Sequence, residues 1–267
     1  MKPTRNIRLT LAFDGSRYHG WQIQKSHVSI QGLVRNAIQT VTGARVNLIG
    51  SGRTDAGTHA RSLVANFTTA SRIPAISLAK ALNSLLPTDI RVLSARDVPL
   101  DFHAQHSAHS KIYRYQIYRG PVMPPHLAHE HYHYPYPLDL EIMARAAQAF
   151  EGTHDFAGFS KAQRSSPRAE AGKEAATDEG DTVRHVFKAE LNAQRRRITF
   201  TVEADGFLHH MVRRMVGTLL EVGRGRRTVE QVKELLKGTL RGTGGFTVPA
   251  HGLILLKVRY RNLGTGS

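Results

Sequence analysis

Apolar and polar residues alternate along the first stretch of the chain. Every second position from 7 to 13 is apolar, which is the pattern of a half-buried strand: Ile7, Leu9, Leu11, Phe13. An apolar helical period then begins after Ser29, a residue suited to cap a helix, and ends at Gly43. The same reasoning predicts strands over 46–49, 63–67 and 90–98 and a helix from Pro74 that ends before Pro87.

The order of the predicted elements is strand, helix, two strands, helix, strand. This is the split βαβ or ferredoxin-like arrangement, in which both helices cover one face of an antiparallel sheet. The second half repeats this order, with strands over 111–119, 183–191, 197–204 and 253–260 and helices over 138–150, 207–222 and 229–236. We therefore expect an α+β protein of two tandem ferredoxin-like (βαββαβ) units with a catalytic cleft between them.

The predicted domains are residues 1–108, which carry a glycine-rich loop, and residues 109–263. A polar stretch over 163–181 has no apolar period and is expected to be a loosely held insertion, and residues 264–267 are expected to form a tail.

The glycine-rich loop lies between two predicted strands, over residues 49–61. Its glycines permit a sharp bend that holds Arg53 and Asp55 outward, two positions apart. An Asp in such a sequence is also commonly a turn former that bonds its own backbone. The loop is not a Walker phosphate cradle, since no Lys-Ser or Lys-Thr follows Gly57.

Two further groups of residues have both a structural and a functional interpretation. Arg213 and Arg214 lie on the polar side of the predicted long helix, where a solvated face is the ordinary interpretation and pairing of Arg213 with Asp55 is the functional one. Tyr113 and Tyr115 share one face of a predicted strand and suit either the core or a platform on which a base stacks.

The composition favours a polyanionic partner. The 267 residues include 37 Lys and Arg against 21 Asp and Glu, a formal net charge of +16, which suits nucleic acid first and an anionic membrane second. There is no cysteine, which excludes thiol catalysis and cysteine-ligated zinc. No apolar run is long enough for a signal peptide or a membrane span, so a cytoplasmic protein is expected.

The histidines between residues 126 and 133 invite a metal interpretation. Their setting lacks the carboxylate or cysteine partners that usually complete a site, so a surface cluster without metal is expected for His126, His129, His131 and His133. The glycines of the segment 242–245 are expected to provide a flexible connection.

The chain closely resembles the TruA family of tRNA pseudouridine synthases. The resemblance runs nearly end to end and rests on eight blocks in the family's order, over residues 13–22, 29–32, 52–57, 86–90, 101–104, 111–115, 210–213 and 252–253. It implies an isomerase that converts uridine to pseudouridine at positions 38, 39 and 40 in the anticodon arm of tRNA, without metal or cofactor. It also implies a homodimer whose subunits together bind the tRNA.

The resemblance implies a role for five residues of this sequence. Asp55 matches the catalytic aspartate, Arg53 the arginine that displaces the target base, Tyr113 the tyrosine that packs on the uracil, Arg213 the partner of the aspartate, and Leu253 an apolar wall. The carboxylate would either attack the substrate covalently or remove a proton from the sugar C2′, and sequence leaves both routes open.

The sequence departs from the family pattern at three positions. Gln105 and His209 stand where arginine is common, and Thr58 stands where valine is usual. Two other classes of function compete with the enzyme: a non-catalytic RNA-binding module, and a metal-dependent hydrolase built on the histidines of 126–133. Asp55 argues for catalysis, since a carboxylate in an RNA groove repels phosphate unless it reacts.

Overall fold

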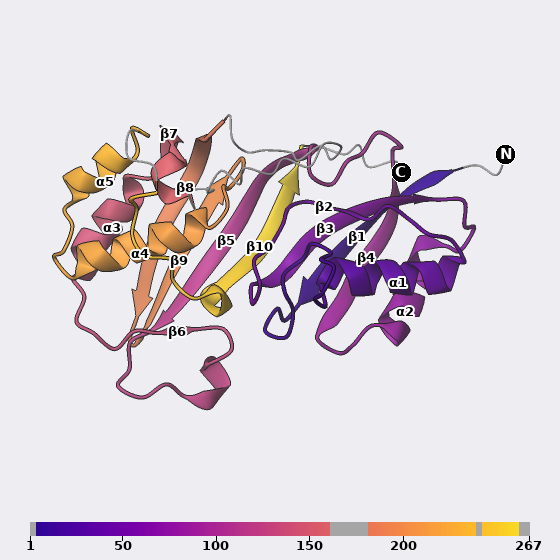
Figure 1. The fold of residues 1–267 in the computed structure, drawn as a ribbon, viewed down its shortest axis with the longest axis horizontal. Coiled ribbons are helices and arrows are strands. Elements are labelled where there is room, and N and C mark those ends of the chain that lie inside the picture. The colour runs from indigo at the N-terminus through magenta and orange to yellow at the C-terminus, as the bar shows by residue number, and fades with distance from the viewer. Residues whose placement is uncertain (1–3, 161–180, 239–241, 262–267) are drawn as a thin grey trace. The chain divides into compact units, whose positions relative to one another are not determined.

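A computed structural model of the chain describes residues 4–160, 181–238 and 242–261 (Figure 1). Its residues form two compact units. Of the described residues, unit 1 takes 4–114, 124–132 and 250–261, and unit 2 takes 115–123, 133–160, 181–238 and 242–249. The expected tail, 264–267, and the expected insertion, 163–181 apart from its last residue, lie outside the described residues.

Unit 1 has the predicted ferredoxin-like order of elements. β1 (Arg5–Phe13) pairs antiparallel with both β3 (His59–Thr69) and β4 (Ile90–Val98), so that Leu9 lies opposite Ala65 on one side and Ala95 on the other. β2 (Ile49–Gly50) pairs antiparallel with β3, and it is much shorter than the predicted strand. The order β4-β1-β3 with β2 on β3 is that of a split βαβ sheet.

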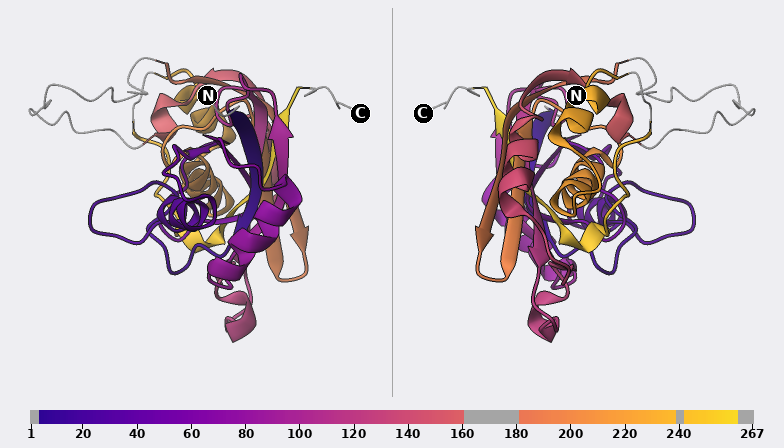
Figure 2. Two further views of the ribbon diagram at one scale, coloured as in Figure 1. Left: turned by 90° about the vertical axis from the view of Figure 1, so that its right-hand side faces the viewer. Right: turned by 90° about the vertical axis from the view of Figure 1, so that its left-hand side faces the viewer.

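Two helices pack in unit 1, α1 (Ile30–Thr42) and α2 (Ala75–Leu85), and they contact one another (Figures 1 and 2). The Ser29 side chain caps α1 by accepting from Gly32 N, and Gly43 ends it with a left-handed φ of 72°. Both cap predictions are thereby confirmed. The core contains fully buried apolar residues from β1 and α1: Ile7, Leu9, Leu11, Ile30, Val34, Ile38.

The C-terminal strand also belongs to unit 1. β10 (Leu253–Tyr260) pairs in parallel with the start of β3, with Ile254 opposite His59. It follows a short 3-10 helix, η3 (Ala250–Gly252), and a second one, η1 (Pro125–Leu127), lies in the same unit. The next strand in the sheet order is β5 (Ala108–Tyr118), whose residues up to Arg114 are in unit 1.

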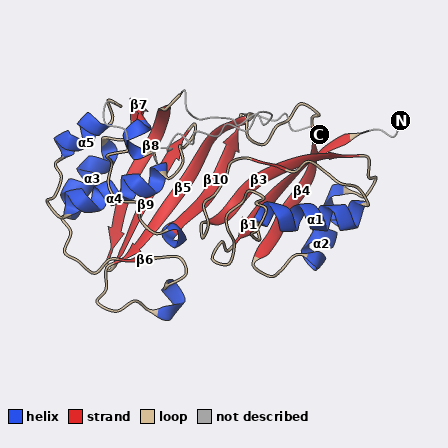
Figure 3. Cartoon of the chain, viewed as in Figure 1, coloured by secondary structure: helices blue, strands red, loops and turns tan. Residues whose placement is uncertain are grey.

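In unit 2 the neighbouring strands of the sheet follow the order β5-β9-β8-β7 (Figure 3). β8 (Val183–Gln194) and β9 (Arg197–Ala204) form the predicted hairpin, and β7 (Gly152–Asp155) pairs antiparallel with β8. The remaining elements are β6 (Tyr132–His133), α3 (Leu140–Gln148), η2 (Phe156–Phe159), α4 (Met211–Gly223) and α5 (Val229–Leu235). Four fully buried aromatic residues dominate its core: Phe150, Phe156, Phe159, Phe200.

Together the units make a mixed α+β protein, as predicted. In the part of the chain that the structure describes, no helix combines the length and apolar character needed to cross a bilayer.

Three local predictions in unit 2 are wrong. α4 begins at Met211 rather than residue 207, because His210 adopts a left-handed φ of 64° that interrupts the helix. Arg214 is half-buried rather than fully solvated, and its Nη2 donates to the carbonyls of Gly242 (2.5 Å) and Gly244 (3.0 Å). The segment 242–245 is therefore held in place rather than flexible, and Gly245 N also donates to Thr218 Oγ1 at 2.8 Å.

Candidate active site

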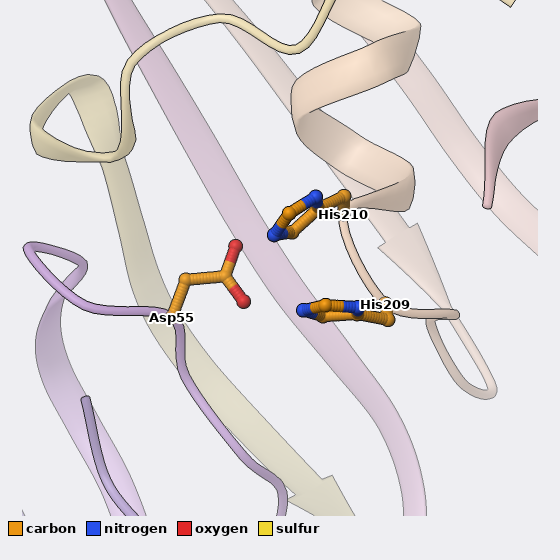
Figure 4. A group of neighbouring side chains, drawn as sticks. All are labelled: Asp55, His209 and His210. Carbon is orange, nitrogen blue, oxygen red and sulfur yellow. The ribbon is translucent and has the colours of Figure 1, made fainter. Parts of the chain in front are cut away.

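The loop that carries Asp55 is a tight turn just before β3. Thr58 N donates to Asp55 O at 3.1 Å, and Gly57, the third residue of this turn, has a φ of 81°. A left-handed angle at that position is what type II turns require and is the reason for glycine. Asp55 is half-buried and Arg53 is exposed. Figure 4 shows the Asp55 side chain extending from this loop.

A neighbouring segment fixes the backbone on both sides of Asp55. Gly57 N donates to Tyr18 O at 3.2 Å, and Trp21 N donates to Thr54 O at 3.3 Å. Gly20 has a φ of 81°, and a Cβ at this position would collide with Thr54 O. Tyr18 and Trp21 are themselves buried. The carboxylate is thus presented by a backbone with several independent restraints, which suits a reacting group.

Tyr113 of β5 lies in the same unit, close enough to Asp55 for the negative charge of the carboxylate to affect the ionisation of the Tyr113 phenol. Its side chain is 7 % exposed. Burial, and secondly the negative charge of Asp55, raise the pKa of the Tyr113 phenol above its usual range. The phenol therefore remains neutral throughout the physiological range. Tyr115, two residues later on β5, is fully buried and donates to Pro249 O at 2.7 Å. Both tyrosines are therefore buried.

Leu253 is brought to the same end of the sheet by the parallel pairing of β10 with β3. It is buried and precedes Ile254, the register partner of His59. A Cβ at Gly57 would lie 3.6 Å from the Ala250 Cβ, so the turn lies against η3. Unit 1 therefore gathers Asp55, Tyr113 and Leu253 from three different strands or strand ends.

His59 is a buried residue of this region to which sequence reasoning gave no role. It is 3 % exposed, and its Nδ1 accepts from Gly15 N at 3.1 Å. Its Nε2 is 2.9 Å from His129 O and 3.1 Å from His251 O, and since both partners are acceptors, we assign the proton to Nε2. One ring thus joins the loop at Gly15, the segment after η1 and η3.

Asp14 completes the surroundings of His59, with its Oδ1 3.1 Å from Nδ1. Partial burial acts to raise the pKa of Asp14. Hydrogen bonds from the Ser16 hydroxyl (2.6 Å) and backbone N–H (2.9 Å) outweigh burial and hold this pKa below its usual range. A cavity of about 340 Å³ in unit 1 is lined by both residues and by the cations Arg61 and Arg91, but not by Asp55 or Tyr113.

The sequence-predicted residues of unit 2 lie at the start of α4. Arg213 is half-buried, and its Nε donates to Val248 O at 2.8 Å. Its expected pairing with Asp55 stays a prediction. His209 and His210 come directly before α4 with their ring centroids 3.9 Å apart (Figure 4). The left-handed backbone of His210 is a feature that periodicity could not reveal.

The histidines of 126–133 do not form the expected surface cluster as a whole. His126 and His129 are exposed, but His131 is buried, with 6 % of its surface accessible. His133 Nε2 contacts Gly120 O at 2.8 Å. None of the four belongs to a group of three or more potential metal ligands among the residues that the structure describes.

Comparisons with known proteins agree with one another. The sequence model of a family described as "tRNA pseudouridine synthase" matches residues 10–107 and 146–261. Three relatives bear the name "tRNA pseudouridine synthase A". The relative from Acetivibrio thermocellus is 42% identical over 96% of this chain and 100% of its own, that from Syntrophotalea carbinolica 43% over 95% and 96%, and that from Thermoanaerobacter sp. 41% over 96% and 100%.

Proposed function

The chain belongs to the tRNA pseudouridine synthase family, and from this premise we propose that Asp55 is the carboxylate with which it isomerises uridine to pseudouridine in tRNA. The observation that carries the proposal is the setting of Asp55 in unit 1. Asp55 is half-buried on a restrained turn, and its negative charge adds to burial in raising the pKa of the nearby Tyr113 phenol. The Tyr113 ring is therefore buried and neutral. A ring of this kind can pack on a uracil without exchanging a proton with it.

The reaction breaks the C1′–N1 glycosidic bond and forms a C1′–C5 bond in its place. The proton on C5 must leave, and N1 ends with a proton, so the product is an isomer and no oxidant or group donor is consumed. Asp55 begins the reaction by covalent attack or by taking the C2′ proton. Both routes require an ionised carboxylate, and the pairing of Arg213 with Asp55 that we propose would favour this form.

The remaining proposed roles concern access to the base. A stacked uracil must be everted at a cost of a few kcal/mol, and the exposed side chain of Arg53, two residues before Asp55, is suited to fill the gap. Leu253 supplies an apolar wall beside the turn.

The substrate positions we propose are 38, 39 and 40 of the anticodon arm. We also propose that residues 1–108 and 109–263 are the functional domains, that the protein acts in the cytoplasm, and that it is a homodimer, which sedimentation analysis tests.

A non-catalytic RNA-binding module is the alternative. Surplus positive charge would support it, but a carboxylate held at the centre of an RNA site would repel phosphate for no benefit. Membership of an isomerase family also favours catalysis.

The test replaces Asp55 by Asn, which keeps the shape of the side chain and removes its charge. We expect pseudouridine formation in an unmodified tRNA transcript, mapped by carbodiimide-blocked reverse transcription, to fall by about 10²- to 10⁴-fold or more, with tRNA affinity changed little. Glu141→Gln, at an exposed carboxylate in the first turn of α3, is the matched control. Equal losses of binding and turnover in Asp55→Asn would support the binding module instead.

A further inference from the structure

Unit 2 contains a cavity that has no part in the proposed chemistry. Its volume is about 310 Å³, and its walls are two aromatic residues, two arginines and one carboxylate: Tyr134, Phe246, Arg224, Arg226, Glu221. The combination of aromatic rings and cations is characteristic of sites that bind nucleotides, since rings stack on bases and guanidinium groups bind phosphates.

The two arginines are available to an anion. Arg224 ends α4 and Arg226 follows it after Gly225, whose φ of 69° turns the chain. Both are exposed, and neither guanidinium has an acidic partner among residues 4–160, 181–238 and 242–261. The guanidinium carbon of Arg224 lies 4.9 Å from the Tyr136 ring centroid, which orients the group through a cation–π contact and leaves its N–H donors for a ligand.

The other walls provide a place for a base. Phe246 has 45% of its surface exposed at the cavity wall, so its ring is accessible to a ligand. Glu221 Oε2 accepts from Arg227 Nε at 2.9 Å, and this ion pair fixes the carboxylate at the cavity wall. A fixed carboxylate accepts from an amino group on a base and repels a carbonyl oxygen in the same place.

We propose that this cavity binds a nucleotide, with its phosphate at Arg224 and Arg226, its base on Phe246, and an amino group of the base toward Glu221. Cytosine, adenine or guanine fits this description, whereas the target uracil has no amino group. The inference rests on the proposed function for one point only, which is that tRNA is the source of the nucleotide. A free nucleoside monophosphate offers the same phosphate and base groups to the cavity.

Cytidine and uridine monophosphate separate this site from the catalytic one. Saturation-transfer NMR is recorded for each nucleotide with the full-length Asp55→Asn protein, so that catalysis has no influence on the result. We expect cytidine monophosphate to bind more tightly than uridine monophosphate, and Arg226→Ala and Arg224→Ala each to weaken it by about tenfold. Arg145→Ala, at an exposed arginine of α3, should leave binding unchanged.

The affinity of the same variants for tRNA identifies the source. A matching loss of tRNA affinity in Arg226→Ala, with none in Arg145→Ala, assigns the cavity to a nucleotide of tRNA; unchanged tRNA affinity assigns it to a free nucleotide. The proposal is overturned if cytidine monophosphate does not bind, or binds equally to Arg224→Ala and Arg226→Ala proteins whose melting temperatures are unaltered.

Discussion

Thr58 and His59 are neighbours at the start of β3, and both are buried, but their polar atoms are in opposite situations. Both ring nitrogens of His59 have partners. The Thr58 hydroxyl, in a residue 1 % exposed, has no hydrogen-bond partner in the described part of the chain. A buried hydroxyl without a partner is a cost to folding, whereas the histidine ties three segments together.

Replacing Thr58 by Val should therefore stabilise the protein. The two side chains have nearly the same shape, so removal of the unsatisfied hydroxyl should raise the free energy of unfolding by about 1 kcal/mol or more. Urea denaturation measures this change, and turnover should be unaffected. Thr68→Val, at a more accessible threonine of β3, serves as the control. A loss of stability in Thr58→Val would mean that the hydroxyl has a partner.

The Tyr113 phenol should contribute to binding through its ring rather than its proton. Because its pKa is raised, we expect Tyr113→Phe to retain most of the turnover and Tyr113→Ala to lose turnover more than tRNA affinity. Steady-state kinetics with tRNA and a binding measurement separate the two effects. If Tyr113→Phe were as inactive as Tyr113→Ala, the hydroxyl would have a chemical role.

The same pKa shift predicts the alkaline stability of the fold. In the unfolded chain the phenol ionises near pH 10, and in the folded protein it ionises at higher pH. The stabilising contribution is thus complete below pH ~10 and is lost as the pH rises toward the folded pKa. Denaturation at increasing alkaline pH should show a smaller loss in Tyr113→Phe than in the wild type.

At the scale of elements, the site depends on connections between segments that are distant in the sequence. His59 of β3 contacts η3 across 192 positions and the segment after η1 across 70. These contacts hold the turn of Asp55 in register with β10, whose first residue is Leu253. The restraint on Asp55 is thus partly supplied by elements that are not adjacent to it in the chain.

Truncation of His59 tests this connection. His59→Ala would leave Gly15 N–H and two carbonyls without their partner and create a cavity, so we expect a loss of about 2–4 kcal/mol in the free energy of unfolding. Turnover measured at a temperature where the variant remains folded should also fall, while tRNA affinity should change little. His185→Ala, at a histidine of β8 in unit 2, is a suitable control for turnover. If the turnover of His59→Ala were unchanged, His59 would contribute to the stability of the fold but not to the positioning of Asp55.

The elements that sequence predicted well are those whose signals are local. The alternating residues of β1 are buried as expected, and α1 has its Ser29 and Gly43 caps. Three other features depend on tertiary contacts, which neither periodicity nor capping rules describe. They are the left-handed backbone of His210 before α4, the hydrogen bonds of the Arg214 side chain to backbone carbonyls, and the pairing of β10 with β3. The candidate site was found through Asp55 and its glycines, but His59 was missed because its partners are remote.

At the scale of the whole molecule, charge governs the encounter with tRNA. A formal net charge of +16 attracts a polyanion over long distances, and each phosphate contact releases counterions from the RNA. Arg195 and Arg196, in the turn between β8 and β9, are exposed examples of this surplus.

We expect tRNA affinity to decrease linearly with the logarithm of salt concentration. Each lost phosphate contact should reduce the slope by about 0.7 to 0.9. Filter binding at several salt concentrations measures it, and Arg195→Ala with Arg196→Ala should give a shallower dependence than the wild type. A slope that is unchanged by these substitutions would place the turn outside the RNA contacts, and the turnover number at saturating tRNA should be the same in either case.

The position of β10 in unit 1 has a consequence for biosynthesis. During translation the residues of the Asp55 turn are synthesised early. β10, which pairs with β3 and begins with Leu253, is synthesised only after all of unit 2. Unit 1 therefore cannot complete its sheet until the residues that follow unit 2 have been synthesised. If Leu253 is the apolar wall that we propose, a chain whose β10 is still in the exit tunnel carries Asp55 but lacks one wall of its substrate site.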